Sequence, residues 1–285
     1  MPHDVILKNG LVVTPTGVIQ GGVAVEGEQI VAIGASATLG QAKREIDVQG
    51  KIIFPGTFDP HVHFGISDRF GDDAMTEDFL HDTKDCLIGG VTTIATTTLI
   101  GKDPLLDLFD HAVRCGTGHS WCDFKITCVV NTLEQVQAIP AVARKGGVSY
   151  KFFTGYAGPQ AEGFGMNPEG ITPAFFHQAC EQFAHCGPPT FAKIHAEDPY
   201  VQGALTLGAD ADIVVIDPEK EVTLGVARMR MRSRADYSLW EGRNVKGVPV
   251  MTFLRGVLVM ENGEIVGQAP TGKFVEQIVK PRRLS

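Results

Sequence analysis

The stretch Phe54-Pro-Gly-Thr-Phe-Asp-Pro-His-Val-His-Phe64 decides how the sequence is interpreted. The apolar run over 52–58 predicts a buried strand, and Asp59-Pro60 marks its end. His61 and His63 follow two residues apart, and in extended backbone residues i and i+2 point to the same face. Two imidazoles that project together from the end of a buried strand suit one metal ion, since imidazole is a common metal ligand. The alternative is two unrelated loop histidines, and the rest of the chain has to decide between them.

The composition is that of an ordinary globular protein. The chain has 285 residues, of which 44% are hydrophobic and 20% are charged. Its net charge of -8 argues against nucleic acid or an anionic membrane as a partner, and no apolar run of about 18 residues predicts a membrane span. The first residues, Met-Pro-His-Asp, carry no basic-then-apolar signal, and the six cysteines include no C-x-x-C pair. We therefore expect reduced thiols in a cytoplasmic protein.

Both ends of the sequence predict β-sheet. Residues 4–50 alternate short β-rich runs with glycine turns, which indicates a small antiparallel sheet. Residues 203–267 have the same texture: the run over 212–217 predicts a strand closed by Pro218, and Asn262-Gly263 is a strong hairpin signal. Each end alone has too few strands to bury a face, so we expect the two to form one sheet structure.

The middle of the chain alternates predicted strands and helices. We expect strands at 52–58, 91–97, 124–130, 148–153 and 190–195, and helices at 76–88, 104–114, 132–144 and 172–185, with Thr76 and Thr172 as N-caps of the first and last helix. Apolar strands that alternate with helices predict a parallel sheet covered by helices. A closed eight-stranded barrel needs about 250 residues, so this region supplies about five of the eight strands. The predicted fold is α/β: a partial TIM-type (β/α) barrel over 52–202, a composite β-sandwich from 1–51 and 203–267, and a C-terminal tail over 268–285.

A lysine inside an apolar strand is the second informative feature. In Val148-Ser-Tyr-Lys-Phe-Phe153, burying the charge of Lys151 is costly unless it is partnered or chemically changed. If Lys151 faces the two histidines it cannot stay an ammonium beside a dication, whereas a neutral lysine can take up carbon dioxide and form a carbamate with two anionic oxygens. The alternative is a lysine that snorkels at a strand end. Tyr156 brings a phenol near the same rim, where it could donate to a developing oxyanion or simply pack in a loop.

A third histidine follows the fifth predicted strand. In Thr190-Phe-Ala-Lys-Ile-His195 the imidazole comes at the strand end, and barrel enzymes place their catalytic residues at the C-terminal ends of strands. Three separate strands thus end in potential ligands, which favours a metal site over coincidence. On the helix over 172–185, the side chains of His177, Glu181 and His185 share one face, which we interpret as solvated rather than as a zinc site.

Taken together, these motifs resemble the amidohydrolase superfamily, and within it the cyclic amidases, hydantoinase and dihydropyrimidinase. The matching segments are Gly56-Thr-Phe-Asp-Pro-His-Val-His63, Gly89-Gly-Val-Thr-Thr93, Ser149-Tyr-Lys-Phe-Phe-Thr-Gly-Tyr156, Ile194-His-Ala-Glu197 and, for the C-terminal sandwich, Gly208-Ala-Asp-Ala-Asp-Ile-Val214, Asp236-Tyr-Ser-Leu-Trp-Glu-Gly242 and Val245-Lys-Gly-Val-Pro-Val250. The resemblance covers nearly the whole chain.

The resemblance implies a metal-dependent hydrolase that opens hydantoin or dihydropyrimidine rings. His61 and His63 would hold the first of two divalent metal ions, with zinc as the expected metal. Lys151, as a carbamate, would bridge the two ions, and His195 would hold the second. A water between the ions would become an effective nucleophile, and Tyr156 would steady the oxyanion. The implied partners are a small cyclic amide or ureide and further copies of the chain in a homo-oligomer, not nucleic acid or membrane.

The sequence also departs from the family pattern. The family supplies another histidine from its sixth strand and an aspartate from its eighth, which carries the proton to the leaving nitrogen, and we find neither here. The chain therefore resembles a member with an internal deletion of the later barrel strands, between about Tyr200 and Gly203. Two alternatives stay open: a non-catalytic amidohydrolase-like scaffold or oligomerisation protein, favoured by the missing aspartate, and the same chemistry on allantoin or dihydroorotate. The joint presence of His61, His63, Lys151 and His195 favours the enzyme.

Overall fold

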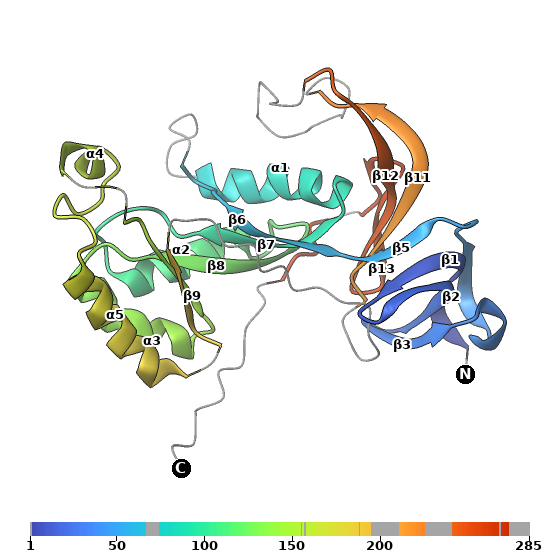
Figure 1. Ribbon diagram of the computed structural model, residues 1–285, viewed down its shortest axis with the longest axis horizontal. Helices are drawn as coiled ribbons and strands as arrows, with labels where there is room; N and C mark the ends of the chain where they lie inside the picture. Colours follow the sequence, from blue (N-terminus) through green and yellow to red (C-terminus); the bar gives the residue numbers. More distant parts are fainter. Residues whose placement is uncertain are drawn as a thin grey trace, which may run out of the picture. The chain divides into compact units, whose positions relative to one another are not determined.

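The protein has a mixed α/β fold with two sheets. The computed structural model describes residues 2–66, 74–154, 156, 158–187, 189–194, 211–225, 241–267 and 269–273 (Figure 1). The chain divides into two compact units: the first holds residues 1–59, 80–93 and 201–271, and the second holds residues 60–79, 94–200 and 272–285. Each unit is described below by itself.

The first sheet has nine strands in the order β14-β13-β12-β11-β5-β1-β2-β3, with β4 also paired to β1. The strands are β1 (His3–Thr14), β2 (Gly17–Glu26), β3 (Gln29–Gly34), β4 (Ala42–Asp47), β5 (Ile52–Pro55), β11 (Ile213–Thr223), β12 (Asn244–Leu254), β13 (Val257–Glu261) and β14 (Glu264–Ile265), and the 3-10 helix η1 (Ser36–Thr38) precedes β4. β5 joins the two ends of the chain, because it pairs with β1 on one side and with β11 on the other. Both β-rich segments thus share one sheet, while their arrangement as a sandwich stays a prediction.

Two details of this sheet differ from the sequence prediction. β1 pairs antiparallel with β2 but parallel with β4 and β5, so a purely antiparallel sheet over 4–50 is wrong. Glycine turns identify hairpins between consecutive strands, but the connection through η1 carries the chain across to β4. β11 also does not end at Pro218; it continues to Thr223 past a register shift between Asp217 and Glu221. Proline is tolerated at such an irregularity because no ladder hydrogen bond is required there. The Asn262-Gly263 turn joins β13 to β14 as predicted, with both residues at positive φ.

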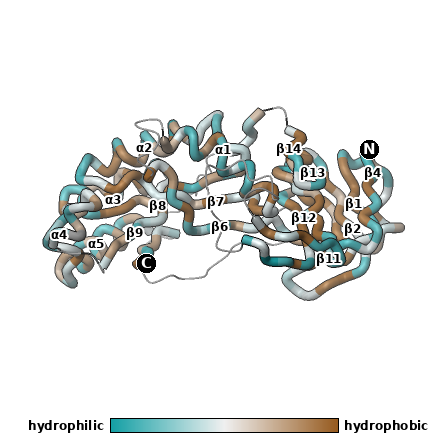
Figure 2. The backbone as a smooth tube through the Cα atoms, turned by 90° about the horizontal axis from the view of Figure 1, so that it is seen from above, coloured by the Kyte–Doolittle hydropathy of each residue, from teal (hydrophilic) through white to brown (hydrophobic). Residues whose placement is uncertain are grey.

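One hydrophobic core lies under the nine-stranded sheet. It includes Leu7, Val12, Val23, Val25, Ile30, Val48, Ile53, Ala211, Ile213, Val215, Val250 and Phe253, and so draws on both β-rich segments. Figure 2 shows hydrophobic colour on β12 and on parts of β1 and β2. Burial of a large aliphatic side chain is worth about 1.5–3 kcal/mol, and this shared core therefore holds the two segments together.

The second sheet has five strands in the order β10-β9-β8-β7-β6. Its strands are β6 (Thr57–Val62), β7 (Val91–Thr97), β8 (Asp123–Val129), β9 (Ser149–Phe152) and β10 (Phe191–Ile194); the helices between them are α1 (Ala74–Ile88), α2 (Leu105–Gly116), α3 (Leu133–Arg144), α4 (Gly158–Gly163) and α5 (Pro173–Cys186). β9 pairs parallel with both β8 and β10, as strand–helix alternation predicts. α2 packs against β8 and α3, and α3 packs against α5 (Figure 1).

The helix ends test the capping predictions. Thr172 caps α5 by accepting a hydrogen bond from the Phe175 amide, with Pro173 as the first helical residue. Thr76, by contrast, is not an N-cap, because α1 already begins at Ala74. Among the described helices, none is long and apolar enough to cross a membrane. All six cysteines lie in described residues and are free thiols.

The decisive stretch is divided between the two sheets, which corrects the prediction of one buried strand over 52–58. β5 ends at Pro55 and β6 begins at Thr57, and along 52–58 only Ile53 and Gly56 are buried. Gly56 stands at the division: its amide donates to the Asp212 carbonyl at 2.8 Å. The Thr57 amide then donates to the Gly90 carbonyl at 3.1 Å, which ties the start of β6 to the residues before β7.

We predict that Gly56→Ala destabilises the protein. An added Cβ would overlap the Thr92 side chain, with the Thr92 Cβ only 2.9 Å away, and overpacking of this kind costs about 1–3 kcal/mol. Chemical denaturation should show this loss, and Thr92→Ala should restore part of it in the double variant. Gly163→Ala is the control, because an added Cβ meets nothing within 4 Å there. Equal stability of the Gly56 and Gly163 variants would contradict the close contact.

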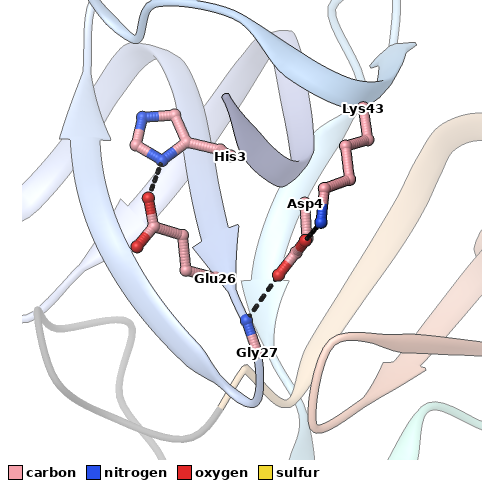
Figure 3. A network of polar contacts seen from close by, with 5 residues as sticks. All are labelled: His3, Asp4, Glu26, Gly27 and Lys43. Carbon is pink, nitrogen blue, oxygen red and sulfur yellow. Dashed lines mark hydrogen bonds and ion pairs between the residues drawn. The ribbon is translucent and has the colours of Figure 1, made fainter. Parts of the chain in front are cut away.

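Ionic contacts tie β1 to its neighbours at the start of the chain (Figure 3). The Asp4 carboxylate accepts from the Gly27 amide at 2.7 Å and from the Lys43 Nζ at 2.6 Å. The His3 Nδ1 and the Glu26 Oε1 lie 2.7 Å apart. The Gly27 amide, and after it the Lys43 ammonium, holds the pKa of Asp4 below its ordinary value of 3.8.

A lowered carboxyl pKa predicts an acid-dependent contribution to stability. The ionised Asp4 favours the folded state above its unfolded pKa, and this contribution is lost as the pH falls through the folded pKa. Asp4→Ala should therefore lower the unfolding midpoint at about pH 7 and have less effect at about pH 2–3. Lys43→Met, which leaves the Gly27 contact in place, should lower the midpoint less. A deficit of the Asp4 variant that does not shrink with acid would contradict this linkage.

Candidate metal-binding site

The two histidines of the decisive stretch lie against each other at the end of β6. Their Nε2 atoms are 3.0 Å apart, and their ring centroids are 5.0 Å apart at an interplanar angle of 48°. His61 is exposed and His63 is half-buried. The Thr97 Oγ1, at the end of β7, lies 3.3 Å from the His63 Nδ1 and so helps to orient that ring with Nε2 toward His61.

Lys151 meets both imidazoles. Its Nζ lies 2.7 Å from the His61 Nε2 and 3.1 Å from the His63 Nε2. Only 3% of the lysine is exposed, and the ring of Phe153 lies 4.5 Å from its Nζ. Burial lowers the pKa of Lys151 from its ordinary 10.5 to about 8, because desolvation disfavours the ammonium. Lys151 is therefore a buried strand residue and not a snorkelling one.

Strand geometry explains why Lys151 faces the histidines. Side chains alternate along β9, so Lys151 and Ser149 share one face of the sheet. On β8, Thr127 is the register partner of Ser149, and its hydroxyl donates to the Ser149 hydroxyl at 3.1 Å. The opposite face of β9 carries Tyr150 and Phe152, and both rings pack on Phe183 of α5. The five-stranded sheet is therefore polar on the face that carries Ser149 and Lys151, called the site face below, and aromatic on the opposite face, which packs against α5.

Tyr156 packs in an aromatic group next to the lysine. Its ring makes edge contacts with Phe153 at 5.7 Å and Phe164 at 5.5 Å between centroids. It also packs against the cluster of Val129, Phe153, Ala161 and Met166. Since Phe153 touches the Lys151 Nζ as well, Tyr156 is connected to the site through one intervening ring. Its predicted role at an oxyanion stays a prediction.

The structure places some of the remaining candidate residues away from the two histidines and does not describe others. His195 and the predicted deletion between Tyr200 and Gly203 lie outside the described residues. On α5, His177 and Glu181 form an exposed pair at 3.8 Å, with 76% and 59% of their side chains exposed, which confirms a solvated helix face. Thr97 and Lys193, which also line the site face, were missed by sequence reasoning. Lys193 carried a signal, because it too is a lysine within an apolar strand.

The donor set fits a divalent metal of the zinc type. Zinc–nitrogen bonds of about 2.0–2.1 Å in tetrahedral geometry place ligand atoms about 3.3 Å apart. The three nitrogen atoms of His61, His63 and Lys151 are separated by 2.7, 3.0 and 3.1 Å, which is close to such a triangle. Within the described ranges, no group of three or more His, Cys, Asp and Glu side chains is placed to hold a metal. Among the described residues, the lysine, or an oxygen group built on it, is the third donor beside the two histidines.

The sequence comparisons find similar proteins that are named hydantoinase and allantoinase. The chain is 41% identical over 86 residues to the D-hydantoinase of Ralstonia pickettii, a match that covers 30% of this chain and 18% of that protein. It is 29% identical over 210 residues to the allantoinase of Enterococcus faecalis, covering 70% of this chain and 42% of that protein. No family model matches the chain. The sequence matches thus span less than half the length of these relatives.

The comparison of folds also finds proteins that are named hydantoinase. The structure resembles that of D-hydantoinase from Bacillus sp. AR9 with a TM-score of 0.74 and 17% identity, covering 98% of this chain and 100% of that chain. The chain is thus similar to proteins named hydantoinase, in sequence over part of their length and in fold. This similarity is in keeping with the resemblance seen in the motifs around His61, Lys151 and Tyr156.

The burial of Lys151 predicts a pH effect on stability. Between about pH 8 and pH 10.5 the unfolded chain binds more protons than the folded chain at this position, so folded stability rises with pH. In buffer free of metal and carbon dioxide, the wild type should gain about 1–3 kcal/mol over Lys151→Met across this interval. Lys145→Met, at a lysine whose side chain is 48% exposed, is the control and should run parallel to the wild type. A parallel profile for Lys151→Met would show that the lysine is not desolvated.

Proposed function

We propose that the chain is a metal-dependent hydrolase of cyclic amides. The observation that carries this proposal is the triangle of the His61, His63 and Lys151 nitrogen atoms, with separations from 2.7 to 3.1 Å. Relatives named D-hydantoinase and allantoinase support the class of substrate. We also infer that the five-stranded sheet corresponds to part of a TIM-type (β/α) barrel, and that the nine-stranded sheet corresponds to the composite sandwich of the family.

The side chains of the triangle would divide the work of holding the metal. His61 and His63 would each present Nε2 to a first ion, as neutral imidazoles. Lys151 would join them after its neutral amine adds to carbon dioxide: a nitrogen–carbon bond forms, one proton is released, and the product is an anionic carbamate. Lowering of the lysine pKa to about 8 favours this step, because the amine reacts only without its proton. His195 would serve a second ion, as the family resemblance implies.

The remaining chemistry would come from the bound metal and from nearby side chains. A divalent ion bound by these residues would supply an activated water and would polarise the amide carbonyl. Thr97 would keep the His63 ring oriented through its contact with Nδ1. Tyr156 would donate to the oxyanion that forms when water attacks the amide carbonyl. The edge contact of its ring with Phe153 would hold the phenol in place.

The substrate would be a small ring that contains an amide or ureide group. The names of the relatives cover hydantoins and allantoin, and the sequence leaves dihydropyrimidines and dihydroorotate in the same class. Four test substrates therefore cover the proposed class: hydantoin, dihydrouracil, allantoin and dihydroorotate. They are called the panel below. The missing aspartate favours the non-catalytic scaffold, whereas the joint presence of His61, His63 and Lys151 favours the enzyme, and the panel separates the two.

Metal content tests the ligand roles first. The purified chain, loaded with zinc and passed over a desalting column, should retain about one zinc ion or more by elemental analysis. His61→Ala and Lys151→Ala should each lose most of this zinc, since each variant removes a corner of the triangle. His177→Ala is the matched control, because His177 is an exposed histidine in the same unit and 76% of its side chain is exposed. Unchanged zinc in His61→Ala would refute the ligand role.

Turnover tests the reaction class. The zinc-loaded chain should open at least one ring of the panel, and Lys151→Ala should abolish the activity while His177→Ala leaves it unchanged. We expect a rate about 10²–10⁴-fold below an ordinary ~1–10³ s⁻¹, because the sequence lacks the aspartate that would carry the proton to the leaving nitrogen. Product formation by liquid chromatography measures this. A rate for the whole panel no higher than that of Lys151→Ala would overturn the proposed function.

A further inference from the structure

Lys193 makes a contact that spans the five-stranded sheet. It lies on β10, the strand at one edge, and its Nζ donates to the carbonyl oxygen of Pro60 on β6, the strand at the other edge, at 2.7 Å. The same Nζ lies 3.2 Å from the Thr127 Oγ1 on β8. Lys193 is the register partner of Lys151, so both lysines are on the site face of the sheet.

This contact is possible only because the sheet curls. In a flat sheet, β10 and β6 would be four strand spacings apart, about 19 Å. An extended lysine reaches about 6 Å from its Cα to its Nζ. A hydrogen bond of 2.7 Å from Lys193 to Pro60 therefore requires the two edge strands to be drawn toward each other across the site face. The carbonyl that Lys193 holds belongs to the residue directly before His61.

We propose that Lys193 is a positioning residue that holds the end of β6, so that His61 and His63 face Lys151. The inference rests on the proposed function, because it assigns Lys193 a part in forming the same metal site. The lysine acts as a clamp between the two edges of the curled sheet. β6 is an edge strand with β7 on one side, and Lys193 supplies part of the restraint that a second neighbouring strand would give.

The chemistry of the contact suits this role. A hydrogen bond from an ammonium to a carbonyl oxygen is stronger than one between neutral groups, and an ammonium has three donors. One donor holds Pro60, and another reaches Thr127, whose hydroxyl donates in turn to Ser149 on β9. The chain of contacts thus links β10, β6, β8 and β9 on the site face. A shift of β6 by one ångström would move both imidazoles relative to Lys151.

Three variants separate positioning from general stability. Lys193→Met keeps the length and the apolar stem of the side chain but removes the donors. Lys193→Arg keeps a cation that can donate to Pro60. Lys125→Met is the matched control, because Lys125 is a half-buried lysine on β8 that shares the face of Thr127, and β7 separates β8 from β6.

Two readouts are needed, and the first requires no metal. In hydrogen exchange followed by mass spectrometry, peptides over 57–66 should exchange about tenfold or more faster in metal-free Lys193→Met than in the wild type, while Lys193→Arg and Lys125→Met stay close to the wild type. The second readout is zinc affinity by chelator competition. Lys193→Met should bind zinc about 10–100-fold more weakly, as removal of supporting contacts does at other metal sites, and Lys193→Arg should recover most of the affinity.

The outcomes distinguish this inference from the proposed function. Unchanged exchange over 57–66, or unchanged zinc affinity, in Lys193→Met overturns the positioning role while the metal site stands. Equal loss in Lys193→Met and Lys125→Met also overturns it, because it shows a general effect on the sheet. Absence of zinc binding by the unaltered chain overturns the proposed function, and with it the assignment of Lys193 to a metal site, whatever the exchange result.

Discussion

The approach of a buried lysine to two imidazoles is the constraint on which the second unit depends. Lys151 is almost fully buried, yet its Nζ lies within hydrogen-bond distance of the Nε2 atoms of His61 and His63. An ammonium in such a place is costly, and the lowered pKa of Lys151 expresses that cost. A neutral amine that meets the two imidazoles, or the proposed carbamate neutralised by a metal ion, would avoid that cost. The burial of Lys151 on β9 thus connects the structure of this strand to the proposed metal-dependent reaction.

The constraint also shapes the sheet around it. β6 and β9 are not neighbours, because β7 and β8 lie between them. Contact between their side chains requires a curved sheet with the polar residues on its inner side, where Ser149, Thr127 and Lys193 also meet. The outer side carries the apolar residues: Tyr150 and Phe152 pack on α5. The Tyr150 hydroxyl donates to the Gly147 carbonyl at 2.6 Å and lies 3.1 Å from the Ile139 carbonyl. The alternation of polar and apolar residues along the strands therefore accounts for both the polar inner side of the curved sheet and the apolar side that packs on the helices.

Much of this could be predicted from the sequence, and the rest failed for identifiable reasons. The strand–helix alternation and the Thr172 cap depend on local pattern, and both were found close to their predicted positions. The division of 52–58 at Gly56 depends on pairing with β11 and on the nearby Thr92, which are distant in sequence. The parallel pairing of β4 with β1 is likewise non-local. Lys193 carried the same signal as Lys151, a lysine within an apolar strand, but its contact with Pro60 is non-local and cannot be predicted from the strand pattern.

The central claim is that His61, His63 and Lys151 form one metal site, and X-ray absorption at the zinc edge tests it most directly. For the zinc-loaded chain the account predicts a first shell of nitrogen and oxygen atoms at about 2.0–2.1 Å, with the scattering pattern of imidazole rings that disappears in part in His61→Ala. The chain has six free thiols, which offer zinc a different environment. A first shell dominated by sulfur at about 2.3 Å, or imidazole scattering unchanged in His61→Ala, would contradict the account.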